Sequence, residues 1–368
     1  MAKVGIVTFY DSYSLGACLQ ACASRDFFQE LGFHAEFVGY KNAYEQGGKS
    51  LLRTGDGSFT GALKSFAKSV IFRGSSCMKQ AYEGESRLYG LPERSVSTVE
   101  EIDSRKYDVL ISGSDQIWNP QITNGIDRAY YLDFGEPKKR VALASSAGSH
   151  EFSADELTQI VPMLNKFDLI AVRESYLLEL LKRNVDARVM LSPDPTLLFD
   201  SEYWLNKSKK GKCRDWGQFS NEPYLLTYFV GKGFHEYHSF IKRYTDRLNM
   251  PVMNIQFNRW NRNGVDKTIF AASPLDFISL VEHASMVITD SFHGVAFSIN
   301  LHVPFVAIEN SRNPARVREL LRNCKLRSRI EPDPSVILEE VSFDAADEYL
   351  TANRIDVRKA FSEVLSEV

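Results

Sequence analysis

The chain has 368 residues and a formal net charge of -3 at pH 7. The length predicts two domains, and the composition is that of an ordinary globular protein, which excludes the fibrous and intrinsically disordered classes. The slightly acidic balance offers no basic face for a polymer of phosphates, so we expect no nucleic-acid partner.

The cysteines and the amino end indicate the compartment. Five cysteines lack the paired spacings of a zinc site, and Cys18 and Cys22 lie four apart in a helical pattern, as small core residues do. This usage predicts a reducing cytoplasm. The chain enters a strand directly without the pattern of a signal peptide, and it has no apolar run of about 18 residues. We therefore expect a cytoplasmic protein without a membrane-spanning helix.

The first predicted domain, residues 1–200, opens with a strand, a polar turn, a helix and a second strand at residues 4–9, 10–16, 17–31 and 35–40. This βαβ pattern lacks the three-glycine fingerprint of a dinucleotide site. Ser14 and Gly16 lie at the carboxyl end of a strand, where such a turn could hold sugar or phosphate oxygens; a solvated turn is the alternative. Residues 42–104 are poorly patterned apart from a helical stretch at 62–72, and we predict an insertion that covers or shapes a cleft.

Further strands are predicted at residues 108–111, 141–145, 169–172 and 188–191, with a helix at 154–165. Asp115 and Trp118 follow the first of these strands. Asp115 could accept a proton from a sugar hydroxyl and Trp118 could stack on a pyranose ring; a capping aspartate with a core tryptophan is the alternative. Arg173, at the end of another strand, is either an anion clamp or the partner of Glu174 or another acid.

A polar, lysine-rich stretch at residues 201–222 is predicted to link the two domains. Its charges indicate a solvated face, or a weak contact with anionic lipid head groups at the membrane surface. The second domain, residues 223–330, repeats the α/β pattern with strands at 224–230 and 251–255 and helices at 235–248 and 274–283. His235 and His238 have no evident third ligand, so we expect no metal site. Helices at 331–368 could cross back to the first domain.

The most informative stretch is a strand-loop-helix-strand unit at residues 286–310. Its loop carries Asp290, Ser291 and His293 at the carboxyl edge of a parallel sheet, where ligands of open α/β proteins bind. Asp290 and Ser291 are good N-cap residues, and the start of the helix is a natural anion site. The alternative is that Asp290 only caps the helix and His293 packs in the core. Two such α/β domains predict a cleft between twin sheets.

Several short motifs, in this order and spacing, together resemble the polysaccharide pyruvyl transferase family: Leu-Gly-Ala-Cys-Leu-Gln20, Gly-Ser-Asp-Gln-Ile-Trp-Asn119, Ser-Ser-Ala-Gly148, Val-Arg-Glu174, Pro-Asp-Pro-Thr-Leu-Leu198 and Thr-Asp-Ser-Phe-His-Gly294. The resemblance implies an α/β fold with two Rossmann-like domains in a GT-B-like arrangement. It also implies a transferase that moves the enolpyruvyl carbons of phosphoenolpyruvate onto two hydroxyls of a sugar as a cyclic ketal.

The resemblance gives His293 the position of the family's catalytic histidine. We expect His293 to act as the acid, oriented by Asp290, with Asp115 as a base or a hydroxyl-positioning group. Members of the family carry an arginine where this chain has Ser291, next to Phe292, so another cation must hold the donor. The candidates for this cation are Arg173, Lys232, Arg259 and Arg316. The scheme requires no metal and no cofactor besides the donor substrate.

The acceptor implied is a sugar of a bacterial cell-surface polysaccharide, such as a capsule or exopolysaccharide, or of its lipid-linked precursor. Two rival functions remain open at this stage. One is a glycosyltransferase that uses a nucleotide sugar, with Glu309 on the ribose. The other is a carbohydrate-binding protein without catalysis, which the serine at position 291 keeps open.

Overall fold

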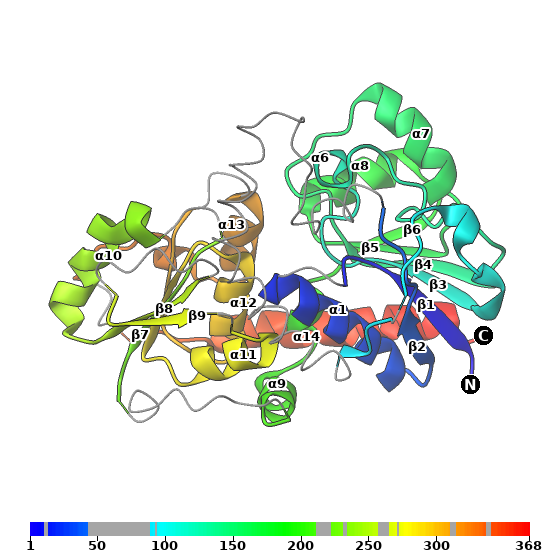
Figure 1. The fold of residues 1–368 in the computed structure, drawn as a ribbon. Helices are drawn as coiled ribbons and strands as arrows, with labels where there is room; N and C mark the ends of the chain where they lie inside the picture. The colour runs from blue at the N-terminus through cyan, green and yellow to red at the C-terminus, as the bar shows by residue number, and fades with distance from the viewer. Residues whose placement is uncertain are drawn as a thin grey trace, which may run out of the picture. The chain divides into compact units, whose positions relative to one another are not determined.

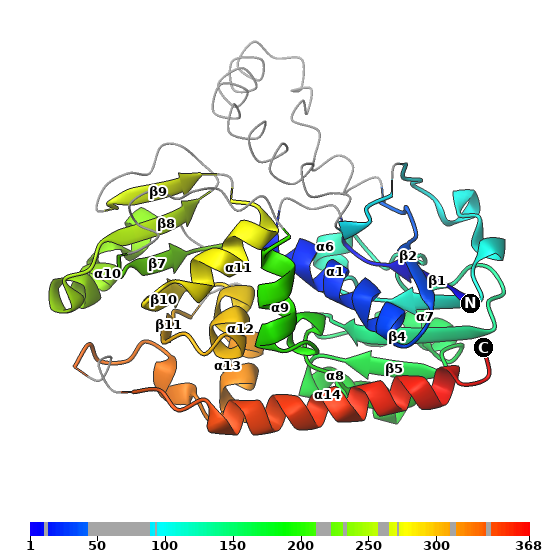
Figure 2. The same ribbon diagram turned by 90° about the horizontal axis from the view of Figure 1, so that it is seen from below.

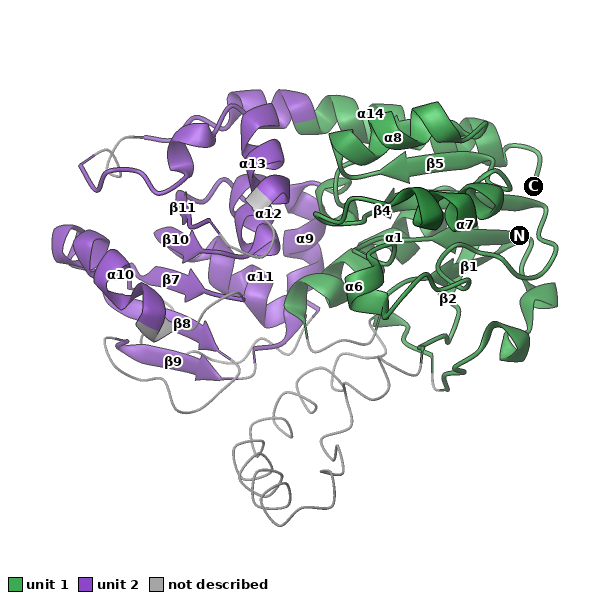
Figure 3. Cartoon of the chain, turned by 90° about the horizontal axis from the view of Figure 1, so that it is seen from above, with its two compact units in different colours: residues 1–50, 86–199, 350–368 green, residues 51–85, 200–349 purple. Residues whose placement is uncertain are grey.

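The computed structural model describes residues 1–10, 14–42, 89–92, 94–210, 222–230, 234–256, 265–270, 272–309, 314–335 and 340–368. The chain divides into two compact units (Figure 3). The first unit comprises residues 1–50, 86–199 and 350–368, and the second comprises 51–85 and 200–349. Each unit is built on a parallel sheet of its own.

The sheet of the first unit has six parallel strands in the order β2-β1-β3-β4-β5-β6. Their bounds are β1 Lys3–Val7, β2 His34–Phe37, β3 Val109–Ser112, β4 Lys139–Ser145, β5 Leu169–Val172 and β6 Arg188–Leu191. The chain moves to one side of β1 to form β2 and to the other side to form β3. The point where this direction reverses, between β1 and β3, is where open α/β sheets bind ligands at the carboxyl ends of their strands.

Helices cover both faces of this sheet. The helices of the unit are α1 Leu15–Glu30, α6 Pro120–Thr123, α7 Ala154–Leu164, α8 Ser175–Asn184 and the 3-10 turns η1 Val99–Glu101, η2 Ser104–Lys106 and η3 Pro195–Leu197. Figure 1 shows α7 and α8 above the sheet, with α1 and the end of α14 (Asp344–Leu365) below it. Because both faces are covered, β3 and β5 are buried along their whole length, as parallel strands usually are.

The sheet of the second unit has five parallel strands in the order β11-β10-β7-β8-β9. Their bounds are β7 Leu225–Tyr228, β8 Val252–Gln256, β9 Lys267–Phe270, β10 Met286–Thr289 and β11 Phe305–Ala307. Figure 2 shows these strands side by side in that order. The direction reverses between β7 and β10, so the second switch point lies at the carboxyl ends of these two strands.

The helices of the second unit are α9 Ser201–Ser208, α10 Phe234–Leu248, α11 Pro274–Glu282, α12 Phe292–Asn300, α13 Pro314–Asn323, the 3-10 turn η5 Arg327–Arg329 and the beginning of α14. Ile241 and Tyr244 of α10 pack on one face of the sheet. On α11 and α12, Phe277 and Phe297 meet edge to face at 5.7 Å, and Trp204 of α9 lies 5.1 Å from Phe297. This aromatic contact anchors the back of α12.

The sequence analysis does not predict the short elements β9 and α9. The expected linker at 201–222 is wrong at its start, because Ser201–Ser208 form α9, capped by the Asp200 side chain, and Trp204 is fully buried. The lysine-rich composition of residues 201–222 gave no indication that Trp204 would be buried. Residues 211–221 lie outside the described part of the chain, as do residues 43–88 with the expected helix at 62–72. Within the described part of residues 331–368, where more than one helix was expected, the structure has one helix, α14, of 22 residues.

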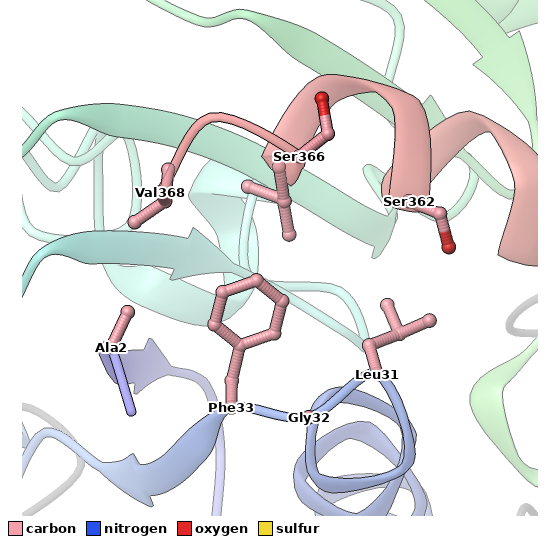
Figure 4. Close-up of a pocket in the computed structure, with 8 residues that line it drawn as sticks. Ala2, Leu31, Gly32, Phe33, Ser362, Ser366 and Val368 are labelled. Carbon is pink, nitrogen blue, oxygen red and sulfur yellow. The ribbon is translucent and has the colours of Figure 1, made fainter.

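Cys18 and Cys22 are buried on α1, as expected of core residues. Within the described ranges, no helix combines the length and the apolar character needed to cross a membrane. A hollow of about 330 Å³ lies at the amino edge of the first sheet, before β1 and β2 and beside the end of α14. Figure 4 shows Leu31, Phe33 and Val368 around it. This is the edge opposite the switch point.

Candidate functional site

Each unit gathers polar side chains at its own switch point. In the second unit the loop from β10 into α12 carries Asp290, which is 2 % exposed. Its carboxylate accepts a hydrogen bond at 2.7 Å from the backbone N–H of Val230, which follows β7. A second hydrogen bond, at 3.1 Å, comes from the hydroxyl of Tyr237 on α10. Asp290 thus joins the two strands between which the sheet reverses direction.

Ser291, not Asp290, is the N-cap of α12. Its hydroxyl accepts a hydrogen bond at 3.3 Å from the backbone N–H of Gly294. The expectation that Asp290 would share this role is therefore wrong, because its carboxylate points to the chain after β7 instead. The N–H of Ser291 donates to the Thr289 hydroxyl at 3.0 Å, so the loop is held at its start as well. Ser291 therefore has a local structural role.

His293 is the second residue of α12, so its ring lies at the amino end of that helix. It is partly buried and meets the ring of Phe292 edge to face at 5.3 Å. The guanidinium of Arg316, on α13, lies over the ring of Phe292, 5.2 Å from its centre. The structure therefore brings together three residues that the sequence proposed separately. Of the two candidate cations that the structure describes, Arg316 is the one that lies beside α12.

Glu309 has a partner that competes with a role in ribose binding. Its two carboxylate oxygens accept hydrogen bonds at 2.5 Å from the guanidinium of Arg318. This bidentate pair holds the pKa of the Glu309 carboxyl below its usual range. A ribose bound by Glu309 would therefore share a carboxylate that already accepts two charged hydrogen bonds.

The first switch point is formed by the chain that follows β1 and β3. The Thr8 hydroxyl donates to the carbonyl of Ser114 at 2.9 Å, and the Gln20 amide donates to the carbonyl of Phe9 at 3.1 Å. Asp115, with a φ of 72°, follows Ser114 in the left-handed region that aspartate tolerates. Its side chain is partly exposed at 17 %, so it is the accessible carboxylate of this loop.

Arg173 is buried in a network of acids, which contradicts its assignment as an open anion clamp. Its guanidinium lies 2.5 Å from Asp194 and 3.9 Å from Asp115, and it also donates to the Ser114 hydroxyl. Its side chain is 4 % exposed. The alternative of pairing with an acid is right, although the acid is Asp194 of η3 and not Glu174. Glu174 instead accepts a hydrogen bond from the Ser146 hydroxyl.

Trp118 belongs to the core, and its assignment as a sugar-stacking residue is wrong. The ring is 1 % exposed and stacks on Tyr131 at 5.4 Å with an interplanar angle of 7°. Its indole N–H donates to the carbonyl of Tyr130 at 2.9 Å. Both the face and the polar edge of the indole are therefore occupied within the protein.

Of the remaining candidate site residues, the structure describes Ser14 and Gly16. Ser14 is the exposed N-cap of α1 and accepts from the N–H of Ala17 at 3.4 Å, while Gly16 is buried in the first turn of that helix. Ser14 lies beyond the carboxyl end of β1 and stays a candidate for a sugar or phosphate oxygen. Lys232 and Arg259 lie outside the described residues.

The sequence analysis missed Tyr237, Asp194 and Ser114. Asp194 sits in the motif Pro-Asp-Pro, but nothing in the sequence paired it with Arg173. Nothing in the sequence linked Tyr237 to Asp290 either, because this contact spans 53 residues. Among the described residues, no group of three or more His, Cys, Asp or Glu side chains could hold a metal ion.

A profile described as Polysaccharide pyruvyl transferase matches residues 15–312. The chain belongs to the polysaccharide pyruvyl transferase family. The matched range contains the loop after β3, the second switch point and the β10–α12 loop, and the family expected from the motifs is confirmed. No curated protein matches the chain.

Solved structures of UDP-N-acetylglucosamine 2-epimerases resemble this pyruvyl transferase family member. The S. aureus protein MnaA with UDP superposes with a TM-score of 0.55 at 11% identity, covering 100% of this chain and 98% of that one. The Methanocaldococcus jannaschii epimerase, in complex with UDP-GlcNAc and UDP, gives 0.54 at 10% identity over 98% and 99%. At these identities the likeness shows the fold alone. The expected α/β class with two parallel sheets is confirmed.

Proposed function

We propose that this family member is a ketal pyruvyltransferase. It moves the three-carbon enolpyruvyl group of phosphoenolpyruvate onto two hydroxyls of one sugar and releases phosphate. The observation that carries the proposal is the position of His293. It lies inside the range matched by the family and in the first turn of a helix that begins at the switch point of the second sheet.

The donor needs positive charge, because phosphoenolpyruvate carries a carboxylate and a phosphate. The first backbone N–H groups of α12 and the guanidinium of Arg316 supply such charge beside His293. With serine at position 291, Arg316 is our choice for the cation that replaces the family arginine. Burial of Arg173 against Asp194 favours this choice over Arg173.

The reaction balances with His293 as the proton donor. His293 protonates the methylene carbon, and the adjacent carbon becomes electrophilic and bonds to the first sugar hydroxyl. The bond to the phosphate oxygen then breaks, and the second hydroxyl closes the ketal. Of the two protons released by the sugar hydroxyls, one restores the proton that His293 gave to carbon and the other protonates the departing phosphate. We assign Asp115 to receive the proton of an acceptor hydroxyl, because its carboxylate is partly exposed at the first switch point.

The acceptor class follows from the family name. We propose a sugar of a bacterial cell-surface polysaccharide or of its lipid-linked precursor, modified in the cytoplasm. The exposed Lys209 and Lys210, directly after α9, support a peripheral contact with anionic head groups that would bring a lipid-linked acceptor close.

The test is a reaction of the protein with phosphoenolpyruvate and a panel of lipid-linked and synthetic glycans. We expect phosphate release that depends on the acceptor, together with a new methyl signal in the proton spectrum of the glycan. In deuterium oxide the new methyl group should carry one deuterium, because an exchangeable side chain delivers the proton to carbon. Turnover of a nucleotide sugar without use of phosphoenolpyruvate would establish a glycosyltransferase instead. Glycan binding without any phosphate release would establish a binding protein.

A further inference from the structure

The Asp290 carboxylate uses both of its oxygens to hold the chain that follows β7. Oδ1 accepts the N–H of Val230 at 2.7 Å, and Oδ2 accepts the hydroxyl of Tyr237 at 3.1 Å. Asp290 directly precedes Ser291, the N-cap of α12, and His293 follows two residues later. The two hydrogen bonds of Asp290 therefore hold the backbone at the start of the turn that carries His293.

Tyr237 is suited to hold that carboxylate. It lies in the first turn of α10, and its ring packs on Phe229 with the ring centres 4.8 Å apart. Burial and the neighbouring Asp290 carboxylate raise the pKa of Tyr237, so the phenol stays protonated at working pH and donates a hydrogen bond to Asp290. A hydrogen bond to a buried carboxylate is among the stronger kind.

We propose that Tyr237 is a positioning residue for the chemistry of His293 and acts through Asp290. The inference rests on the proposed function. Its hydroxyl links α10 to the loop that enters α12, so the two helices that begin at this switch point keep a fixed separation. Catalysis depends on such placement, because a displacement of about 1 Å costs roughly 100-fold in rate.

A second tyrosine on the same helix provides a matched control. Tyr244 lies two turns further along α10, and its hydroxyl donates to the carbonyl of Pro332 at 2.6 Å. Exchange of either tyrosine for phenylalanine removes one hydroxyl from α10, together with the hydrogen bond that it donates to Asp290 or to the carbonyl of Pro332. Only the exchange at position 237 removes a bond to the loop of His293.

The experiment compares Tyr237→Phe and Tyr244→Phe with the wild-type protein by acceptor-dependent phosphate release. We expect Tyr237→Phe to lower kcat about 10- to 100-fold while the KM for phosphoenolpyruvate changes less than about threefold, and Tyr244→Phe to leave both near wild type. Both variants should lose a similar few degrees in Tm. The double variant Tyr237→Phe/Asp290→Asn should be no slower than Asp290→Asn alone, because the tyrosine acts through the carboxylate. Equal kcat values for the two tyrosine variants, or additive losses in the double variant, would overturn the proposal.

A readout without turnover separates this proposal from the proposed function. In protein labelled at histidine, the imidazole resonances of His293 should shift in Tyr237→Phe and stay in place in Tyr244→Phe. If the wild-type protein releases no phosphate but this shift appears, the pyruvyltransferase assignment fails and the link from Tyr237 to His293 stands. If the His293 resonances are unchanged in Tyr237→Phe, the link is refuted whatever the activity.

Discussion

The Arg173 guanidinium lies 2.5 Å from the Asp194 carboxylate, and both side chains are almost entirely shielded from water. Asp194 also caps η3, with one oxygen accepting from the N–H and the hydroxyl of Thr196 at 2.9 and 2.7 Å. The pair therefore connects the ends of β5 and β6, and through Ser114 it reaches the loop after β3. A buried pair of this kind contributes little net stability, yet either charge left alone is costly.

Removal of one partner should destabilise the first unit strongly. We expect Asp194→Ala or Arg173→Met to lower the free energy of unfolding by about 3–5 kcal/mol, because each leaves a buried charge without its partner. Arg173→Met combined with Asp194→Leu should recover a large part of this loss. Chemical denaturation provides the measurement, and single variants within about 0.5 kcal/mol of wild type would show that the pair is dispensable.

His293→Ala should abolish turnover without affecting the fold. Loss of a general acid typically lowers the rate by about 100- to 10,000-fold. His283→Ala is the matched control, since His283 is an exposed histidine that caps the end of α11 at the opposite edge of the same sheet. Acceptor-dependent phosphate release and Tm are measured for both variants. A near-native rate for His293→Ala would remove this residue from the mechanism.

Arg316→Ala and Arg318→Ala distinguish the donor cation from a neighbour on the same helix. Arg316 lies over Phe292, next to His293, whereas Arg318 is paired with Glu309. We expect Arg316→Ala to raise the KM for phosphoenolpyruvate by about 10- to 100-fold, which corresponds to one lost charged hydrogen bond, and to leave the KM for the glycan nearly unchanged. Arg318→Ala should change neither constant by more than about twofold, since exposed ion pairs contribute little. Equal donor KM values for the two variants would exclude Arg316 as the donor's cation.

Substitution of Trp118 should reveal a structural residue. Trp118→Ala removes a buried ring stacked on Tyr131 and should lower the free energy of unfolding by about 3–5 kcal/mol. Trp118→Phe should retain much of that stability and a wild-type KM for the glycan. A large rise in the glycan KM with unchanged Tm in Trp118→Phe would restore the sugar-stacking role that the sequence suggested.

Regular elements could be predicted from the sequence because their signals are local. Leu169–Val172 and Arg188–Leu191 form strands at the predicted bounds, since β-rich runs flanked by polar residues leave little choice. β9 was missed because Lys267–Phe270 has only a weak alternation. α9 was missed because its few apolar residues are followed by a lysine-rich stretch, and burial of Trp204 depends on Phe297, far away in the sequence.

The candidate site was predictable only in part for a related reason. His293 stands in a recognisable strand-loop-helix unit, so its place at a sheet edge followed from local pattern. The partners of the charged residues are set by tertiary contacts, and no spacing revealed that Arg173 would meet Asp194 or that Asp290 would meet Tyr237. The role of Trp118 could not be predicted for the same reason, since a tryptophan after a glycine turn is compatible with stacking on a sugar and with packing in the core.

The glycine that follows His293 limits what can be engineered at this loop. A Cβ at Gly294 would stand 2.8 Å from Cγ2 and 2.9 Å from Cβ of Thr289, distances that real Cβ atoms essentially never show. The first turn of α12 therefore rests directly on the end of β10, and even alanine at position 294 would lift it. Exchanges that alter the reactivity of His293 can be made at position 293 itself or at Arg316. Variants at position 294 would instead disturb the packing of α12 on β10, whatever their effect on the reaction.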